Sequence, residues 1–284
     1  MICKTILTAL LSLTMLWNET TAQTAAHIPG TTNSPVVFKS GYLQVNGVKL
    51  FWKEAGQGRP ILFLHGGLGD SEAHFTNQLE VFAQTNRVIT FHTRGHGKSE
   101  FDDKKLSYQL FTDDTYAVLR QLKLDSIDIV GFSDGAIIGA MLAMQHPGIV
   151  KKLVMIGANA TADALYPETI EWVRGWDEVK MTAYARSVFK EHPQPERLQD
   201  YVAQMQKLFL TEPDLKEADL QKISCPTLLM AGDHDMIKTE HQVYLYRSIP
   251  KSSLSILSDA GHEVHIERSV IANEMIRSFL EKKE

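Results

Sequence analysis

Residues 127–145 read IDIVGFSDGAIIGAMLAMQ, and this stretch decides the fold. The apolar run 127–130 is typical of a strand buried on both faces, and residues 136–145 have the length and periodicity of a helix. Between them, GFSDG at 131–135 matches the pattern G-x-S-x-G. A serine on a sharp turn from strand to helix projects its hydroxyl above the sheet, and the tight backbone needs glycine on both sides. The context predicts that Ser133 is a nucleophile, with a helix N-terminus behind it that favours developing negative charge.

The rest of the chain repeats this alternation of strand and helix. Further strands are expected at residues 42–45, 48–54, 61–64, 87–91, 153–156, 227–230 and 254–257, and those from residue 61 onward look buried on both faces. Helical length and periodicity are found at residues 71–83, 106–122, 240–248 and 264–280. Asn46-Gly47 separates the first two strands and is a strong signal for a two-residue hairpin turn. The pattern predicts an α/β fold with a mostly parallel eight-stranded sheet and helices on both faces.

The interval 158–221 interrupts the alternation. It holds helical patterns at 168–176, 182–191 and 197–209 but no convincing strand. Because so short a segment returns to the sheet at both ends, we interpret it as an inserted helical cap; a second independent domain is the alternative. The expected organisation is an exposed N-terminal segment at 23–40, a core formed by 41–157 and 222–284, and a cap at 158–221.

The N-terminus has the layout of a secretory signal peptide at residues 1–22, with one lysine, a short apolar run and then small polar residues. The apolar run is too short to span a bilayer comfortably; an uncleaved anchor or a buried N-terminal helix is the alternative. We expect an exported protein, periplasmic or secreted, with no stable membrane span after cleavage. Cleavage after Ala22 leaves Cys225 as the remaining cysteine, which excludes an intramolecular disulfide.

The composition narrows the class of partner. The chain has 284 residues, of which 44% are hydrophobic and 22% charged, and its formal net charge is -5. These values are ordinary for a globular protein. No cluster of lysine and arginine interleaves with aromatic residues, so nucleic-acid binding has little support. A small molecule is the expected partner.

Ser133 needs a base and an acid, because a serine hydroxyl is a poor nucleophile at neutral pH. Strand 227–230 leads into Asp235, and strand 254–257 leads into His262. Open α/β sheets place their sites just past the carboxyl ends of their strands. The sequence therefore predicts His262 as the general base and Asp235 as the acid that orients it.

Three other side chains compete for these roles. Asp233 and Asp259 are rival carboxylates, and each could instead cap a turn through its side chain. His265 is a rival base, but it falls in the helix after the loop, where a packed or solvated position is expected. We therefore favour Asp235 and His262.

The segment HGGLGD at 65–70 follows a predicted strand and supplies backbone donors. Acyl transfer needs N–H groups aimed at the oxyanion of the tetrahedral intermediate. We expect the N–H of Gly67, with that of Leu68 as the alternative, to act together with the N–H of Asp134. The run lacks the Gly-Lys-Ser/Thr ending of a phosphate loop and the spacing of a dinucleotide fingerprint. His65 is expected to hold this loop in place.

Aromatic side chains are candidates for the wall of a substrate pocket. Tyr166, Trp172 and Trp176 fall in the predicted cap and could line an apolar acyl pocket; alternatively, the cap helices bury them against the core. His65 and Phe132 are the further pocket candidates.

A metal site is the other interpretation of the 11 histidines, since Asp233-His234-Asp235 could provide ligands. The sequence has no H-E-x-x-H, H-x-H or paired cysteine spacing. We therefore expect neither a catalytic metal nor a cofactor.

Taken together, the ordered motifs resemble the α/β-hydrolase superfamily, in its capped branch of microbial esterases, meta-cleavage C–C hydrolases and valacyclovirase-like enzymes. The motifs are HGGLG at 65–69, RGHGKS at 94–99, GFSDG at 131–135, GDHD at 232–235 and AGH at 260–262, and the resemblance covers residues 41–282. It implies an α/β-hydrolase fold with a helical cap. It also implies the nucleophile, acid, base and oxyanion donor at Ser133, Asp235, His262 and Gly67.

Two positions depart from the pattern of this superfamily. Relatives usually carry Asp two residues before the Arg of the RGHG loop, whereas this chain has His92 before Arg94. That loop shapes the pocket floor in the family, so the change concerns substrate size more than mechanism. Proline iminopeptidases of similar fold carry Pro in HGGPG, whereas Leu68 stands here, which weakens an aminopeptidase interpretation.

The resemblance implies hydrolysis of a small ester through an acyl-enzyme. C–C bond hydrolysis, amidase or aminopeptidase action, and cofactor-free haloperoxidase chemistry use the same triad and stay open as alternatives. Serine at position 133 argues against haloalkane dehalogenase and epoxide hydrolase chemistry, which similar enzymes perform with Asp. A ligand-binding pseudo-hydrolase is the non-enzymatic alternative, although such a protein would not require all three triad residues.

Overall fold

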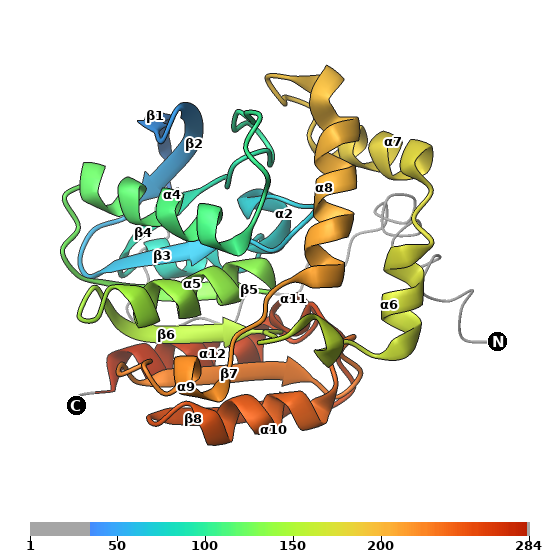
Figure 1. Cartoon of the computed structure of the whole chain (residues 1–284). Coiled ribbons are helices and arrows are strands. Elements are labelled where there is room, and N and C mark those ends of the chain that lie inside the picture. The colour runs from blue at the N-terminus through green and yellow to red at the C-terminus, as the bar shows by residue number, and fades with distance from the viewer. Residues whose placement is uncertain (1–34, 283–284) are drawn as a thin grey trace, which may run out of the picture. The chain divides into compact units, whose positions relative to one another are not determined.

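An eight-stranded sheet forms the centre of the computed structural model, which describes residues 35–282 (Figure 1). The strand order is β1-β2-β4-β3-β5-β6-β7-β8. The strands are β1 Lys39–Val45, β2 Val48–Ala55, β3 Pro60–Leu64, β4 Arg87–Phe91, β5 Ile127–Phe132, β6 Val150–Ile156, β7 Thr227–Gly232 and β8 Ser252–Leu257. The pairs β1–β2 and β2–β4 are antiparallel and all other pairs are parallel. The predicted fold class is confirmed; the predicted signal peptide and residues 23–34 lie outside the described residues.

The hairpin that opens the sheet follows from its turn residues. Asn46 and Gly47 have φ angles of 45° and 98°. Two consecutive positive φ angles give the two-residue turn whose twist matches the flanking strands, and asparagine and glycine adopt them at the lowest cost. Val45 therefore pairs with Val48, and the register continues to Lys39 and Glu54.

Alternate side chains of the central strands enter two hydrophobic clusters. In β3, Leu62 and Leu64 belong to one cluster, and Ile61 and Phe63 belong to the other. Because successive side chains of a strand point to opposite faces, the clusters lie on the two faces of the sheet. The first includes residues of α4 Tyr108–Gln121, α5 Asp134–Gln145 and α10 Thr239–Ser248; the second includes residues of α3 Leu79–Ala83, α11 Val264–Glu267 and α12 Ser269–Glu281. Both faces are covered, as predicted.

Two predicted helices are each divided. The predicted helix 71–83 is α2 Ser71–His74 and α3, separated by a turn that begins at Phe75, whose φ is -131°. The predicted helix 264–280 is α11 and α12, separated at Arg268, whose φ is -119° and whose guanidinium donates to the carbonyl of Asp259. Phe75 is fully buried and Arg268 holds the loop of Asp259, so in both places tertiary contacts override helical periodicity.

The last strand was predicted to be buried on both faces, and this was wrong. β8 is the edge strand of the sheet, and Ile256 is 37% exposed. Its sequence SSLSIL alternates serine with larger side chains along part of its length. Ser253 and Ile256 point to opposite faces and both are exposed, so neither face of this edge strand is fully covered.

The interval 158–221 contains helices and no strand, and all of it is described. Its longer helices are α6 Pro167–Arg174, α7 Glu178–Val188 and α8 Leu198–Thr211, followed by the short α9 Glu217–Leu220. In Figure 1, α6, α7 and α8 lie on the side toward which the parallel strands point. Tyr201 and Met205 of α8 are fully buried in the same hydrophobic cluster as α4 and α5, so this helix packs onto the core.

Within residues 35–282, no helix has both the length and the hydropathy required to cross a bilayer.

Candidate active site

Ser133 sits on a strained turn between β5 and α5. Its φ and ψ are 50° and -116°, which is a rare conformation for a residue with a side chain. A Cβ on Gly131 would collide with the backbone of Gly135, and a Cβ on Gly135 would collide with the carbonyl of Leu64. Glycine is therefore required on both sides of Ser133, because the backbone folds closely onto itself at Gly131 and lies against β3 at Gly135.

Ser133, His262 and Asp235 form one hydrogen-bonded chain. His262 Nε2 lies 3.0 Å from Ser133 Oγ, and His262 Nδ1 lies 2.7 Å from Asp235 Oδ1. The same Oδ1 accepts from the N–H of Ile237 at 3.0 Å, which fixes the carboxylate. Burial opposes the charged imidazolium, but the Asp235 carboxylate outweighs it, so the pKa of His262 is raised above its usual value. The arrangement can take a proton from the serine hydroxyl and stabilise the resulting imidazolium.

The three rival side chains are engaged elsewhere. Asp233 accepts from the N–H of Ala260 at 3.1 Å, and Asp259 pairs with Arg268 at 2.7 Å. His265 is fully buried on α11, and its Nε2 donates to the carbonyl of His74 at 2.6 Å. None of the three is hydrogen-bonded to Ser133 or His262 among the residues that the structure describes.

The glycine-rich loop after β3 lies against the turn that carries Ser133. A Cβ on Gly66 would be 3.1 Å from Ser133 Cβ, and a Cβ on Gly67 would be 2.6 Å from Asp134 Oδ2. The Gly67 N–H forms no hydrogen bond with any residue from 35 to 282 and is free to meet a ligand. Leu68 has a φ of 59°, so its peptide turns away from an extended path directly after Gly67. This geometry can supply backbone donors near Ser133.

His65, a predicted loop-holding and pocket residue, has both ring nitrogens engaged. Its Nε2 accepts from the N–H of Thr93 at 3.0 Å, so Nδ1 carries the proton and donates to the carbonyl of Gly66 at 2.7 Å. Burial lowers the pKa of His65 to about 3, with a smaller effect from His92. The ring is therefore neutral and holds the loop.

Asp134 presents a buried carboxyl group beside Ser133. Tyr108 of α4 donates to its Oδ1 at 2.8 Å, and Oδ2 has no hydrogen-bond partner among the described residues. Burial raises the pKa of Asp134 to about 7, against the lowering effect of the Tyr108 hydrogen bond. Sequence reasoning missed Tyr108, because it follows no motif and lies in the first turn of an otherwise ordinary helix.

Two of the predicted pocket aromatics, Trp172 and Trp176, belong to a series of rings in contact. Trp172 and Trp176 are in edge contact at 5.4 Å, and Trp176 continues to Phe209 of α8 at 5.8 Å. A Cβ on Gly67 would be 2.6 Å from Phe209 Cζ, so this aromatic series reaches the glycine-rich loop. Sequence reasoning did not single out Phe209, since one phenylalanine near a helix end carries no distinguishing signal.

Phe132 and Tyr166 occupy other positions. Phe132 is 3% exposed, and its ring packs among His74, His262 and His265 at centroid distances of 5.0, 4.9 and 4.6 Å. It is therefore a packing residue behind His262. Tyr166 precedes α6, and its N–H donates to the carbonyl of Met236. That bond ties the start of the cap to the loop that carries Asp235.

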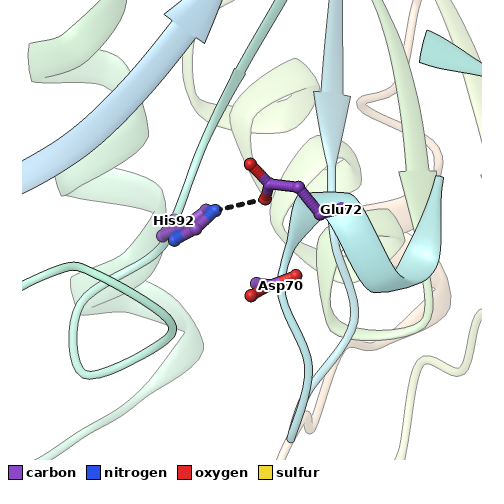
Figure 2. Close-up of side chains that lie close together, drawn as sticks. All are labelled: Asp70, Glu72 and His92. Carbon is purple, nitrogen blue, oxygen red and sulfur yellow. Dashed lines mark hydrogen bonds and ion pairs between the residues drawn. The ribbon is translucent and has the colours of Figure 1, made fainter. Parts of the chain in front are cut away.

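One group of side chains within the described residues has the spacing of metal ligands: Asp70, Glu72 and His92 (Figure 2). The tautomer of His92 argues against a metal. Its Nδ1 accepts from the N–H of Lys98 at 3.0 Å, so Nε2 carries the proton and donates to Glu72 at 2.7 Å. Lys53 also lies 2.9 Å from Glu72. The lone pair that a metal needs is absent from Nε2, and a cation already neutralises the carboxylate.

Known proteins resemble this chain along most of its length. Residues 59–201 match the family model described as alpha/beta hydrolase fold. The human protein named Serine hydrolase BPHL is 26% identical over 255 residues, which cover 85% of this chain and 86% of that protein. A solved meta-cleavage product hydrolase from Pseudomonas fluorescens superposes with a TM-score of 0.73 at 19% identity, over 84% of this chain and 97% of its own. A thermophilic esterase from Thermogutta terrifontis gives 0.68 at 24% identity, over 85% and 98%.

Proposed function

Because the chain belongs to the alpha/beta hydrolase fold family, we propose that it is a serine hydrolase that cleaves small carboxylic esters. The observation that carries this proposal is the hydrogen-bonded chain from Ser133 through His262 to Asp235. A free backbone N–H beside that chain supports it, because acyl transfer develops negative charge on oxygen next to the nucleophile.

The proposed reaction proceeds in two halves. His262 Nε2 takes the Ser133 proton as Oγ attacks the ester carbonyl, and the N–H groups of Gly67 and Asp134 receive the oxyanion. The tetrahedral intermediate collapses to an acyl-enzyme, and the imidazolium gives its proton to the leaving alcohol. A water molecule, deprotonated by His262, then hydrolyses the acyl-enzyme and restores Ser133. Asp235 keeps its charge throughout and stabilises the imidazolium.

The aromatic side chains beside the site support an apolar acyl group. Trp172, Trp176 and Phe209 form a continuous aromatic series that reaches the loop of Gly67. Aromatic side chains provide much apolar contact area with few mobile bonds. We propose that the acyl chain lies along this series.

The test is hydrolysis of p-nitrophenyl acetate, butyrate and octanoate by the wild type and by Ser133→Ala. We expect turnover by the wild type and a loss of at least about 10⁴-fold in the variant. A fluorophosphonate probe is used alongside, since it labels an activated serine whatever the natural substrate. Labelling without ester turnover would retain the serine nucleophile and reject the ester, directing attention to amides or C–C bonds. Absence of both would reject the proposed function.

A further inference from the structure

His74 accepts a hydrogen bond from the glycine-rich loop, although it lies outside the motif that defines that loop. The N–H of Gly66 donates to His74 Nδ1 at 3.1 Å, which joins the start of the loop to the last residue of α2. The ring also fills the space beside Gly69, where a Cβ would collide with it. His74 thus contacts the loop on both sides of Gly67.

The two peptide groups of Gly66 are held by two different histidines. Its N–H meets His74, and its carbonyl accepts from His65 Nδ1 at 2.7 Å. That carbonyl belongs to the same peptide unit as the Gly67 N–H, and the two groups point in opposite directions in a trans peptide. Fixing Gly66 on both sides therefore fixes the direction in which the Gly67 N–H points. An amide that accepts at its oxygen is also a better donor at its nitrogen.

His74 is in turn connected to the segment that carries the base. His265 Nε2 donates to the backbone carbonyl of His74 at 2.6 Å, and α11, which holds His265, begins directly after the His262 loop. Phe132 packs between the His74 and His262 rings, with centroid distances of 5.0 and 4.9 Å. The glycine-rich loop and the His262 loop therefore share one set of buried contacts.

We propose that His74 is a positioning residue that sets the direction of the Gly67 N–H relative to His262. The inference rests on the proposed function, because it assigns the Gly67 N–H as an oxyanion donor. A donor contributes to catalysis only when it is aimed at the position of the developing oxyanion. Burial and the neighbouring imidazoles lower the pKa of His74 well below its usual value, so Nδ1 stays an acceptor.

A matched pair of variants tests this role. His74→Asn places Oδ1 where histidine carries Nδ1 and keeps the acceptor, whereas His74→Leu has nearly the same shape as asparagine and lacks it. We expect His74→Leu to lower kcat for p-nitrophenyl butyrate by about 10- to 100-fold with KM within about twofold. We expect His74→Asn to recover most of that loss. A trifluoromethyl ketone, whose serine adduct carries an oxyanion, should bind His74→Leu more weakly by the same factor.

The outcomes separate this inference from the proposed function. Thermal unfolding of both variants shows whether they are folded, and kcat is compared only after that. If the wild type is active and folded His74→Leu keeps its kcat, or if both variants lose kcat equally, the positioning role is overturned and the serine hydrolase stands. If His74→Leu does not fold, His74→Ala, which also lacks the acceptor, replaces it: a loss of kcat that His74→Asn recovers supports the role, and an unchanged kcat overturns it. An inactive, unlabelled wild type overturns both proposals.

Discussion

Histidine side chains have opposite pKa shifts at the loop that carries His262 and around the loop that carries Gly67. At His262 the carboxylate of Asp235 lies 2.7 Å from Nδ1, and the pKa is raised. Around the glycine-rich loop the pKa is lowered at each of three buried or partly buried histidines, namely His65, His74 and His96. Burial acts against the charge in both regions, so the partner decides the outcome.

The difference teaches how one residue type can serve two purposes in one site. A base has to accept and release a proton near neutral pH, which requires a nearby anion to stabilise the imidazolium. A residue that holds a loop has to keep the same donors and acceptors at every working pH, which requires that it stay neutral. Backbone partners meet that need: His65 bonds Thr93 and Gly66, and His74 bonds Gly66.

Removing the anion should have the largest effect. Asp235→Asn keeps the shape of the side chain but favours the wrong tautomer of His262, so we expect kcat to fall by about 10⁴-fold. The base must be neutral to act, so activity rises with pH through the pKa of His262. Without the carboxylate that pKa falls, and the acid limb of the pH–kcat profile should move to lower pH. A loss of less than tenfold, or an unmoved acid limb, would contradict the role of Asp235.

Displacing the Gly67 N–H should lower kcat less than Asp235→Asn does. In Gly67→Ala the new methyl group would lie 2.6 Å from both Asp134 Oδ2 and Phe209 Cζ, so the peptide has to shift. We expect kcat to fall by about 10²- to 10³-fold, as when one oxyanion donor is lost. Gly41→Ala is the control, because its Cβ would meet nothing closer than Trp52 Nε1 at 3.5 Å. Equal activity in the two variants would argue that the Gly67 N–H does not meet the oxyanion.

A third test concerns the buried carboxyl group between the two loops. The pKa of Asp134 is raised from 3.8 to about 7, which means that folding disfavours its charged form. The resulting loss of stability is absent below pH 4, grows as pH rises from about 4 to 7 and is complete above pH 7. The full shift corresponds to roughly 4 kcal/mol. In urea unfolding, Asp134→Asn should gain stability relative to the wild type between pH 4 and 8; a constant difference across that range would contradict the raised pKa.

The sequence predicted the parts of this molecule that depend on strand order. Buried strands are recognisable as apolar runs, and side chains just beyond their carboxyl ends have to meet, which is why Ser133, Asp235 and His262 could be placed together in advance. The edge position of β8 was missed, because an apolar run does not reveal how many neighbours a strand has.

Residues contributed by helices could not be predicted in the same way. Tyr108, His74 and Phe209 come from α4, α2 and α8, and each reaches the site through tertiary packing. Helical periodicity shows which face is buried but not what that face meets. The division of helix 71–83 matters here, because it ends α2 at His74 and so places that ring against Gly66.

The smallest effect is expected at the second histidine–carboxylate pair, His92 and Glu72. It resembles the pair of His262 and Asp235 in distance, at 2.7 Å, but the Glu72 side chain is 42% exposed. Burial raises the pKa of Glu72, yet His92 and Lys53 outweigh it and the net direction is downward. The stabilisation is therefore present above pH 4.5 and is lost as pH falls below it. Because solvent screens the pair, Glu72→Gln should change the free energy of unfolding at pH 7 by less than about 1 kcal/mol, with kcat unchanged. A larger loss would show that exposure matters less than distance in deciding what a carboxylate does for its histidine.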